Sequence, residues 1–245
     1  MIWEPGNFEI EKTSVWSFPE RGSWATHDGK WRGNWSPYVP RNIILRYSKE
    51  QDTVLDQFVG GGTTLVEAKL LNRNAIGVDV NEKALARCRE KTAFSRKDLI
   101  CFTELKKGDA RDLSFLRDES IDLICTHPPY ADIIKYSAGE DISEDLSNLA
   151  PERFLSEMKK VAAESWRVLK PERFCCVLIG DIRRNGYVTP LGFQVLTAFE
   201  EAGFRTKEIV IKEQHNCKST SYWEKRSEKC NFLLLAHEYL FVLKK

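Results

Sequence analysis

A proline-rich stretch at residues 126–130 has the residue types needed to activate a weakly nucleophilic amine. It reads Thr126-His127-Pro128-Pro129-Tyr130 and follows directly after an apolar run. The exocyclic amine of a nucleic-acid base is a poor nucleophile because its lone pair is delocalised, and two hydrogen-bond acceptors can localise that pair. The His127 side chain and a proline carbonyl in a backbone fixed by two prolines would supply the acceptors, and the Tyr130 ring could stack on an extruded base. The alternative is a Pro-Pro turn that only closes a strand.

A glycine-rich turn precedes this stretch in the chain. Residues 59–64 read Val-Gly-Gly-Gly-Thr-Thr, between an apolar run and a helical pattern. Glycines let the backbone approach a ligand closely, and the N-terminus of a helix supplies free N–H groups and partial positive charge. No Gly-Lys-Ser/Thr follows, so the turn is not a P-loop.

Two acidic residues follow the next two expected strands. Asp79 can accept hydrogen bonds from both hydroxyls of a ribose, and Asp109 can accept from an adenine amino group. Each could instead be an ordinary cap or turn residue. With the glycine-rich turn they predict a site for an adenosine-containing cofactor, which a nicotinamide dinucleotide would also satisfy.

The elements that must position these residues alternate from residue 53 onward. The clearest is a helix at 151–170, where apolar residues recur at steps of three and four. Repeated strand–helix units with continuous apolar strands predict an α/β fold, with a mostly parallel sheet and helices on both faces. Strands are expected at 54–58, 76–80, 100–104, 121–126, 174–180, 208–212 and within 233–243, and helices at 63–72, 81–94, 151–170 and 191–202.

Residues 1–50 differ in composition from the rest of the chain. They hold five of the seven tryptophans, with Gly, Pro, Arg and Ser interleaved, and show helical spacing only behind Pro40. Disordered segments avoid large aromatic residues. We therefore expect this segment to pack over the core or over a ligand.

Length and composition favour a single domain over residues 1–245, with an α/β core at 51–245. No apolar run approaches the ~18 residues of a membrane span, and the N-terminus lacks the layout of a signal peptide, so a cytoplasmic location is expected. The seven cysteines form no C-x-x-C pair, so no metal site is expected. No Pro-Cys dipeptide is present, which removes the nucleophile that methylation of a cytosine ring carbon would require.

The net charge of +1 means that any affinity for nucleic acid must come from local patches. Residues 132–150 and 213–230 are the candidate substrate loops. The second contains basic and aromatic residues predicted to bind substrate, although a solvated loop would have the same composition: Lys218, Tyr222, Trp223, Lys225 and Arg226.

Three pieces of the sequence resemble the DNA amino-methyltransferases: residues 55–64, 77–81 and 126–130. That family methylates N4 of cytosine or N6 of adenine with S-adenosylmethionine, and the resemblance implies a Rossmann-like class I methyltransferase fold. The family usually has Asp, Asn or Ser where this chain has His127. A neutral imidazole can also accept a hydrogen bond, so the chemistry survives at that position.

The resemblance also implies residue roles. His127, Pro128, Pro129 and Tyr130 would be the catalytic residues. Asp79 would hold the ribose and Asp109 the adenine, and the methionine end and remaining cofactor contacts would fall to Asp56, Phe58, Gly60, Gly62, Thr63, Thr64, Pro40 and Arg41.

Several functions stay open at this point. A DNA amino-methyltransferase is the leading hypothesis, and Thr126 with the non-acidic His127 favours cytosine N4 slightly over adenine N6. An amino-methyltransferase acting on RNA is the first alternative, because no large segment remains for target recognition. The others are a cofactor-binding protein without turnover and a nicotinamide dehydrogenase.

Overall fold

The computed structural model describes residues 2–137, 142–216 and 220–245. Its strands are β1 (Val15–Trp16), β2 (Thr53–Asp56), β3 (Asn74–Asp79), β4 (Thr103–Lys107), β5 (Ile121–Thr126), β6 (Leu169–Ile179), β7 (Ile182–Arg184), β8 (Tyr187–Thr189), β9 (Arg205–Glu213) and β10 (His237–Lys244). Its helices are α1 (Tyr38–Tyr47), α2 (Thr63–Leu70), α3 (Glu82–Thr92), α4 (Pro151–Val168), α5 (Leu191–Glu201) and α6 (Thr220–Cys230).

One sheet of eight strands organises the described residues, in the order β1-β9-β10-β6-β5-β2-β3-β4. All neighbours are parallel except β10, which is antiparallel to both β9 and β6. The carboxyl ends of β2, β3 and β5 therefore meet at one edge of the sheet. The glycine-rich turn, Asp79 and the Thr-His-Pro-Pro-Tyr stretch follow directly from these three strand ends.

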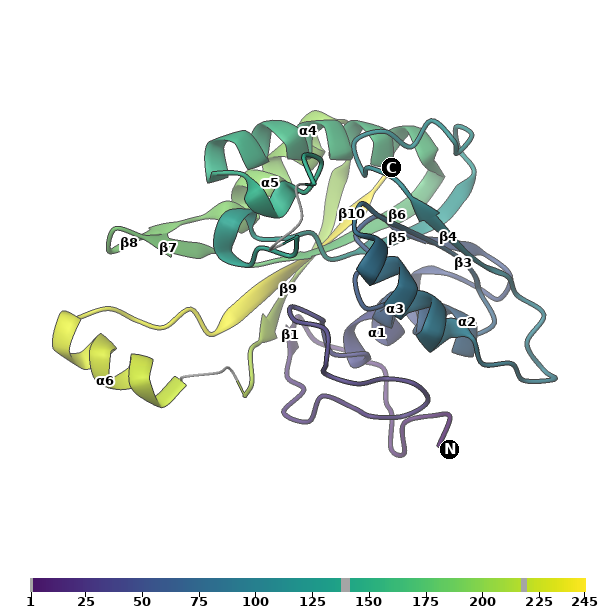
Figure 1. Cartoon of the computed structure of the whole chain (residues 1–245), viewed down its shortest axis with the longest axis horizontal. Helices are drawn as coiled ribbons and strands as arrows, with labels where there is room; N and C mark the ends of the chain where they lie inside the picture. Colours follow the sequence, from purple (N-terminus) through teal and green to yellow (C-terminus); the bar gives the residue numbers. More distant parts are fainter. Residues whose placement is uncertain (1, 138–141, 217–219) are drawn as a thin grey trace.

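Helices cover both faces of the sheet, with α1, α2 and α3 on one side and α4 and α5 on the other (Figure 1). Successive side chains of a strand point to opposite faces. Cys175 accordingly packs with Phe154 of α4, whereas its neighbour Cys176 packs with Ile43 of α1. The predicted α/β class is confirmed. No helix in the described part of the chain is long and apolar enough to cross a membrane.

Several elements differ from the sequence prediction. The strand β6 begins at Leu169, although the helical pattern predicts a helix as far as residue 170. Pro171 is tolerated there because the β5–β6 register shifts between Ile121 and Leu123, opposite this part of β6. The short hairpin β7–β8 and the helix α6 were not predicted, and α6 occupies most of the stretch expected to be a loop.

The tryptophan-rich N-terminal segment packs onto α2, as its composition predicts. Glu67 of α2 is fully buried and accepts hydrogen bonds from Trp24 Nε1 and His27 Nε2, each at 2.7 Å. Arg41 Nη1 of α1 donates to the same carboxylate at 2.9 Å. A buried charge is tolerated when it is paired and hydrogen-bonded. This contact fixes the N-terminal segment against the helix that follows the glycine-rich turn.

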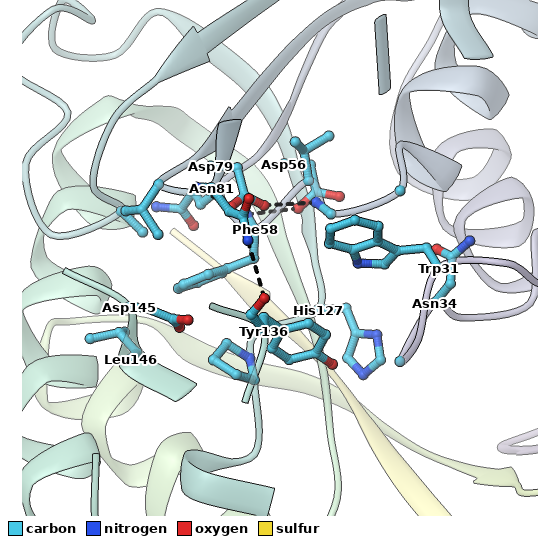
Figure 2. A pocket seen from close by; sticks show the side chains of 18 of the residues that line it. Trp31, Asn34, Asp56, Phe58, Asp79, Asn81, His127, Tyr136, Asp145 and Leu146 are labelled. Carbon is cyan, nitrogen blue, oxygen red and sulfur yellow. Dashed lines mark hydrogen bonds between the residues drawn. The ribbon is translucent and has the colours of Figure 1, made fainter. Parts of the chain in front are cut away.

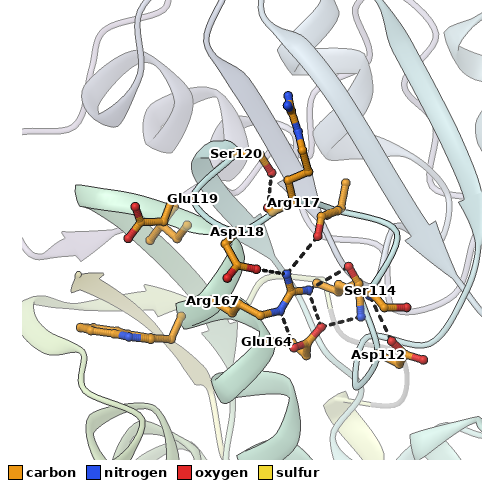
Figure 3. A network of polar contacts seen from close by, with 12 residues as sticks. Asp112, Ser114, Arg117, Asp118, Glu119, Ser120, Glu164 and Arg167 are labelled. Atoms are coloured by element: carbon orange, nitrogen blue, oxygen red, sulfur yellow. Dashed lines mark hydrogen bonds and ion pairs between the residues drawn. The ribbon is translucent and has the colours of Figure 1, made fainter.

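The segment between β4 and β5 is held against α4 by Arg167 (Figure 3). The guanidinium donates to the carbonyl oxygens of Leu113 and Leu116, both at 2.9 Å, and pairs with Glu164 and Asp118. Because Asp109 lies at the start of this segment, the network helps to position a predicted cofactor residue.

Candidate active site

A cavity opens at the carboxyl ends of β2, β3 and β5, and we call it the first cavity. Asp56, Phe58, Gly60, Asp79 and Asp109 all line it, so the structure brings together these five predicted cofactor residues. The side chains of Asp56, Phe58 and Asp79 lie around the cavity with the Trp31 ring in Figure 2.

Asp56 ends β2 at the base of this cavity. Its carboxylate accepts hydrogen bonds from the Thr126 hydroxyl at 2.8 Å, from the Thr64 hydroxyl at 2.5 Å and from the Phe58 amide at 3.1 Å. Burial raises the pKa of Asp56 to about 6, although these hydrogen bonds act in the opposite direction. Asp56 thus joins the glycine-rich turn to the end of the strand that leads into His127.

Asp79 ends β3 and holds the glycine-rich turn from the other side. Its Oδ2 accepts from the Gly60 amide and its Oδ1 from the Asn81 amide, both at 2.9 Å. Burial raises the pKa of Asp79 to about 6 as well. Asn81 is the expected cap of α3, since its side chain accepts from the Lys83 amide.

The three glycines of the turn serve different purposes. Gly62 has φ +82°, and a Cβ there would lie 2.6 Å from Cys88 Sγ of α3. A Cβ on Gly61 would lie 2.8 Å from Cβ of Trp31. Gly60 and Gly61 line the first cavity, whereas Gly62 lets α2 begin against α3 and is not among the lining residues.

Four further predicted cofactor residues lie outside the cavity lining. The Thr63 hydroxyl donates to Asn34 Oδ1 at 2.6 Å, and the Thr64 hydroxyl donates to Asp56. Arg41 is buried in ion pairs with Glu4 and Glu67, and the adjacent Pro40 is buried in α1. Thr63 and Thr64 therefore support the walls of the cavity, and Pro40 and Arg41 belong to the N-terminal packing.

Asp109 lines the cavity while forming a close ion pair with Arg111. Arg111 also pairs with Glu157 of α4, so both contacts fix the orientation of the Asp109 carboxylate. Another part of the wall comes from the expected substrate loop at 132–150, which contributes Tyr136, Glu144, Asp145 and Leu146. Residues 138–141 of that loop lie outside the described residues.

A second, larger cavity adjoins the first. Five residues line both cavities: Gly33, Asn34, Trp35, His127 and Tyr136. The rest of its wall includes Phe18, Arg21 and Arg32 from the N-terminal segment. The tryptophans of the N-terminal segment predict that it packs over the core or over a ligand. Local patterns did not single out Trp31 and Trp35, which line these cavities.

His127 lies at the wall that the two cavities share. Its ring stacks on Trp35, with centroids 5.4 Å apart and planes 25° from parallel. Burial lowers the pKa of His127 to about 4, so the imidazole is neutral at physiological pH. Of the two prolines that follow, Pro128 lines the second cavity and Pro129 the first.

The Tyr130 hydroxyl lies between His127 and a carboxylate that sequence analysis did not identify. It is 2.9 Å from His127 Nε2 and 2.5 Å from Glu238 Oε1 of β10. Glu238 Oε2 accepts from Lys212 Nζ of β9 at 2.8 Å. Four side chains from three separate parts of the sequence thus form one hydrogen-bonded row beside the second cavity.

The aromatic and basic residues of α6 lie apart from both cavities. Tyr222 and Trp223 are exposed, and Arg226 lies over the Trp223 ring at 5.7 Å. Neither they nor Lys225 line either cavity, and α6 projects from the body of the fold (Figure 1). Lys218 lies outside the described residues.

The residues of the first cavity fit an adenosine-containing cofactor that carries positive charge. Asp56, Asp79 and Asp109 supply acidic groups at the ends of three strands, and no cationic side chain is among the described lining residues. The backbone of Gly60 and Gly61 forms part of the wall. A Cβ on Gly61 would collide with Trp31, and one on Gly60 would lie 3.1 Å from Trp31 Nε1. A sulfonium and an ammonium group suit such acidic surroundings, whereas a pyrophosphate does not.

Comparison with known proteins agrees with this chemistry. The sequence model of a family described as DNA methylase matches residues 6–90 and 121–245, which is most of the chain. The chain belongs to the DNA methylase family. A general methyltransferase domain model also matches residues 55–128. As a member of this family the chain uses S-adenosylmethionine as its cofactor. This excludes the nicotinamide dehydrogenase alternative.

Curated relatives match over part of the chain. A tRNA (guanine(10)-N2)-dimethyltransferase of Methanothermobacter thermautotrophicus is 36% identical over 109 residues, which cover 44% of this chain and 31% of the relative. A type II methyltransferase of Lactococcus lactis subsp. cremoris is 41% identical over 75 residues, which cover 29% of this chain and 26% of the relative. The aligned part thus spans about a third of the length of these relatives or less.

Solved structures support the fold. A crystal structure of an S-adenosylmethionine-dependent methyltransferase from Methanosarcina mazei superposes with a TM-score of 0.57 at 16% identity, covering 83% of this chain and 96% of the other. A crystal structure of an S-adenosylmethionine-dependent methyltransferase from Aquifex aeolicus superposes with a TM-score of 0.51 at 18% identity, covering 83% of this chain and 88% of the other. The predicted Rossmann-like methyltransferase fold is confirmed.

Proposed function

We propose that this chain transfers the methyl group of S-adenosylmethionine to the exocyclic amino group of a base in DNA, with cytosine N4 favoured over adenine N6. The observation that carries the proposal is the position of His127 on the wall common to the first and second cavities. A hydrogen-bond acceptor at that wall can reach an amine in one cavity while the methyl donor occupies the other.

The first cavity is the proposed cofactor site. Asp79 would accept from the ribose hydroxyls and Asp109 from the adenine amino group, while Asp56 and the turn at Gly60 would face the methionine end. The bound cofactor supplies an activated methyl group. The protein holds that group against the shared wall, and the N-terminal segment over the glycine-rich turn limits access of water.

His127 and the Pro128 carbonyl are the proposed acceptors for the two amine protons. With both N–H bonds engaged, the nitrogen lone pair is directed towards the methyl group and away from conjugation with the ring. This role requires a neutral imidazole, which the lowered pKa of His127 supplies. After methyl transfer the nitrogen releases one proton to solvent.

The second cavity is the proposed base site. Aromatic rings of Trp35, Tyr130 and Tyr136 line it, and an extruded base is held by stacking on such rings. Arg32 lies in the same wall and would face the phosphate backbone. The substrate loop at 132–150 contributes Ile133, Ile134 and Tyr136 to this cavity. The helix α6 is proposed to contact nucleic acid outside the cavity, within one domain that spans 1–245.

A second candidate substrate is RNA. It is supported by the similarity to a tRNA (guanine(10)-N2)-dimethyltransferase over 109 residues, whereas similarity to type II methyltransferases supports DNA. The first relative acts on an exocyclic guanine amine, as its name states. Binding of the cofactor without turnover is the remaining alternative.

A tritiated-methyl transfer assay tests the proposal. The protein is incubated with labelled S-adenosylmethionine and duplex DNA, single-stranded DNA or RNA, and the modified nucleoside is identified by mass spectrometry. We expect label in N4-methylcytosine from DNA, and a rate of labelling about 10²–10³-fold lower with the His127→Ala variant. Label confined to RNA would select the alternative substrate, and cofactor binding without label in any nucleic acid would overturn the proposal.

A further inference from the structure

The row Lys212–Glu238–Tyr130–His127 has a defined geometry. Glu238 and Lys212 are register partners on the antiparallel strands β10 and β9, so the backbone itself brings them together. The Glu238 side chain is almost buried, at 9% exposure, and that of Lys212 is at 13%. An ion pair in such surroundings is screened little by solvent.

Lys212 favours the ionised form of the Glu238 carboxyl. Burial is the largest single influence and raises the pKa of Glu238. The charge of Lys212, the neighbouring His127 and the hydrogen bonds from Lys212 and Tyr130 together outweigh burial and lower the pKa below its ordinary value. The Lys212 ammonium occupies Oε2 and leaves Oε1 for the Tyr130 hydroxyl. An ionised carboxylate can only accept hydrogen bonds.

This fixes the direction of each hydrogen bond in the row. The Tyr130 hydroxyl has a single proton and donates it to Glu238, so its oxygen is left as an acceptor. His127 Nε2, at 2.9 Å from that oxygen, must then carry the proton and donate. A neutral imidazole with a proton on Nε2 has its lone pair on Nδ1, and Nδ1 has no hydrogen-bond partner among the described residues.

We propose that Glu238 and Tyr130 are positioning residues, which hold His127 as the Nε2–H tautomer and so present Nδ1 as the acceptor for the substrate amine. The inference rests on the proposed function for the identity of that amine. The tautomer itself is a property of the protein alone. The wrong tautomer would direct an N–H donor at the amine and oppose the reaction.

The Tyr130 hydroxyl therefore has a role beyond that of its ring. If Tyr130 acted only as a stacking surface, removal of the hydroxyl would leave activity nearly unchanged. If the hydroxyl holds the tautomer, Tyr130→Phe should lower the methyl-transfer rate about 10-fold, the rate equivalent of one hydrogen bond. Glu238→Gln should do the same, because an amide can donate to the Tyr130 oxygen and reverse the row.

Tyr239→Phe is the matched control. Tyr239 is the next residue on β10, and its hydroxyl lies near Asp181 Oδ2 and His237 Nε2, at 3.4 and 3.0 Å. It lines neither cavity. Tyr239→Phe therefore also removes a tyrosine hydroxyl close to Glu238, but that hydroxyl makes no hydrogen bond to any residue of the row.

The direct test is nitrogen-15 NMR of the histidine rings in the protein without substrate. The chain has four histidines, and the signals that vanish in His127→Asn identify those of His127. We expect the Nε2–H tautomer in the wild type and in Tyr239→Phe, and a shift towards Nδ1–H in Tyr130→Phe and Glu238→Gln. A wild-type Nδ1–H tautomer, or a tautomer unaffected by both substitutions in folded protein, would overturn the inference.

A double-mutant cycle links the tautomer to the reaction. Asn has no tautomers. Tyr130→Phe should therefore lower the methyl-transfer rate about 10-fold when His127 is present, and only slightly when His127 is replaced by Asn. An equal cost in both backgrounds would show that the hydroxyl acts independently of His127 and would contradict the inference. If the wild type methylates no nucleic acid, the proposed function fails, while the NMR result still decides the tautomer.

Discussion

The Thr63 hydroxyl donates a hydrogen bond to Oδ1 of Asn34, 2.6 Å away. This bond joins the first turn of α2 to the N-terminal segment that carries Trp31 over the glycine-rich turn and Trp35 onto His127. Both cavities therefore depend on a contact between residues 29 positions apart in the sequence. Thr63 would therefore act on the proposed cofactor site by holding its wall.

Thr63→Val should weaken S-adenosylmethionine binding by about 1 kcal/mol, because one side-chain hydrogen bond of the wall is lost. Isothermal titration calorimetry measures the change. Thr206→Val is the control, since its hydroxyl bonds to Glu200 on the exposed surface. Equal affinity of Thr63→Val and the wild type would show that the segment is held without this bond.

Asp79→Ala should weaken S-adenosylmethionine binding by about 1.5–3 kcal/mol, the range for hydrogen bonds to a charged group. The substitution removes the proposed ribose contact and also the acceptor for the Gly60 amide. Calorimetry on the folded variant checks it, with the exposed Asp98→Ala as the control. Unchanged affinity would remove Asp79 from the cofactor site.

Cofactor affinity should depend on pH near 6. Burial raises the pKa values of Asp56 and Asp79 to about 6, so both are ionised above that pH and become protonated below it. A cationic ligand favours the ionised carboxylates. Affinity should thus be highest above pH 7 and fall below pH 6, by at most about 10-fold per pH unit for each carboxyl. Calorimetry between pH 5 and pH 8 should show proton release on binding, and proton uptake would contradict the assignment.

His127→Ala should lower the methyl-transfer rate by about 10²–10³, the range for losing one oriented transition-state contact. His127→Asn should retain more activity because its amide oxygen accepts a hydrogen bond. The lowered pKa of His127, about 4, means that protonation of this residue removes activity only near pH 4 and below. Single-turnover rates at saturating cofactor measure both effects. Equal rates for Ala and Asn would assign catalysis to the Pro128 carbonyl alone.

Replacement of Lys225 and Arg226 by Ala should weaken nucleic-acid binding and reduce its salt dependence. If each contacts one phosphate of a duplex, the slope of log K against log salt should fall by about 0.9 per residue. Cofactor affinity should stay the same, because α6 lies outside both cavities. Fluorescence anisotropy at several salt concentrations is the measurement, and an unchanged slope would assign α6 to solvated surface.

The periodicity of apolar residues in the sequence was sufficient to predict the strands and helices of the core. The apolar runs that became β2, β3 and β5 are buried in the middle of the sheet, and the helix α4 follows its three- and four-residue pattern. Local patterns failed where a tertiary contact decided the outcome. Leu169 continues the helical pattern of α4 but pairs with Ile121 as part of β6.

The sequence by itself determined the cofactor edge of the site. Asp56, Gly60, Asp79 and Asp109 each follow a parallel strand, and the carboxyl ends of parallel strands meet at one edge, so local order in the chain implies their proximity. The same reasoning brought the Thr-His-Pro-Pro-Tyr stretch to that edge. The order of these residues along the chain was therefore enough to predict methyl-transfer chemistry at this edge.

Only the tertiary structure decided what surrounds these residues. Trp35 stacks on His127 from the N-terminal segment, and Glu238 reaches Tyr130 from the last strand, 108 positions further along the chain. Lys212 meets Glu238 through the register of two antiparallel strands. Such contacts depend on how distant segments pack, and no periodicity encodes that packing. The tautomer of His127, which decides whether it accepts or donates a hydrogen bond, follows from this packing alone.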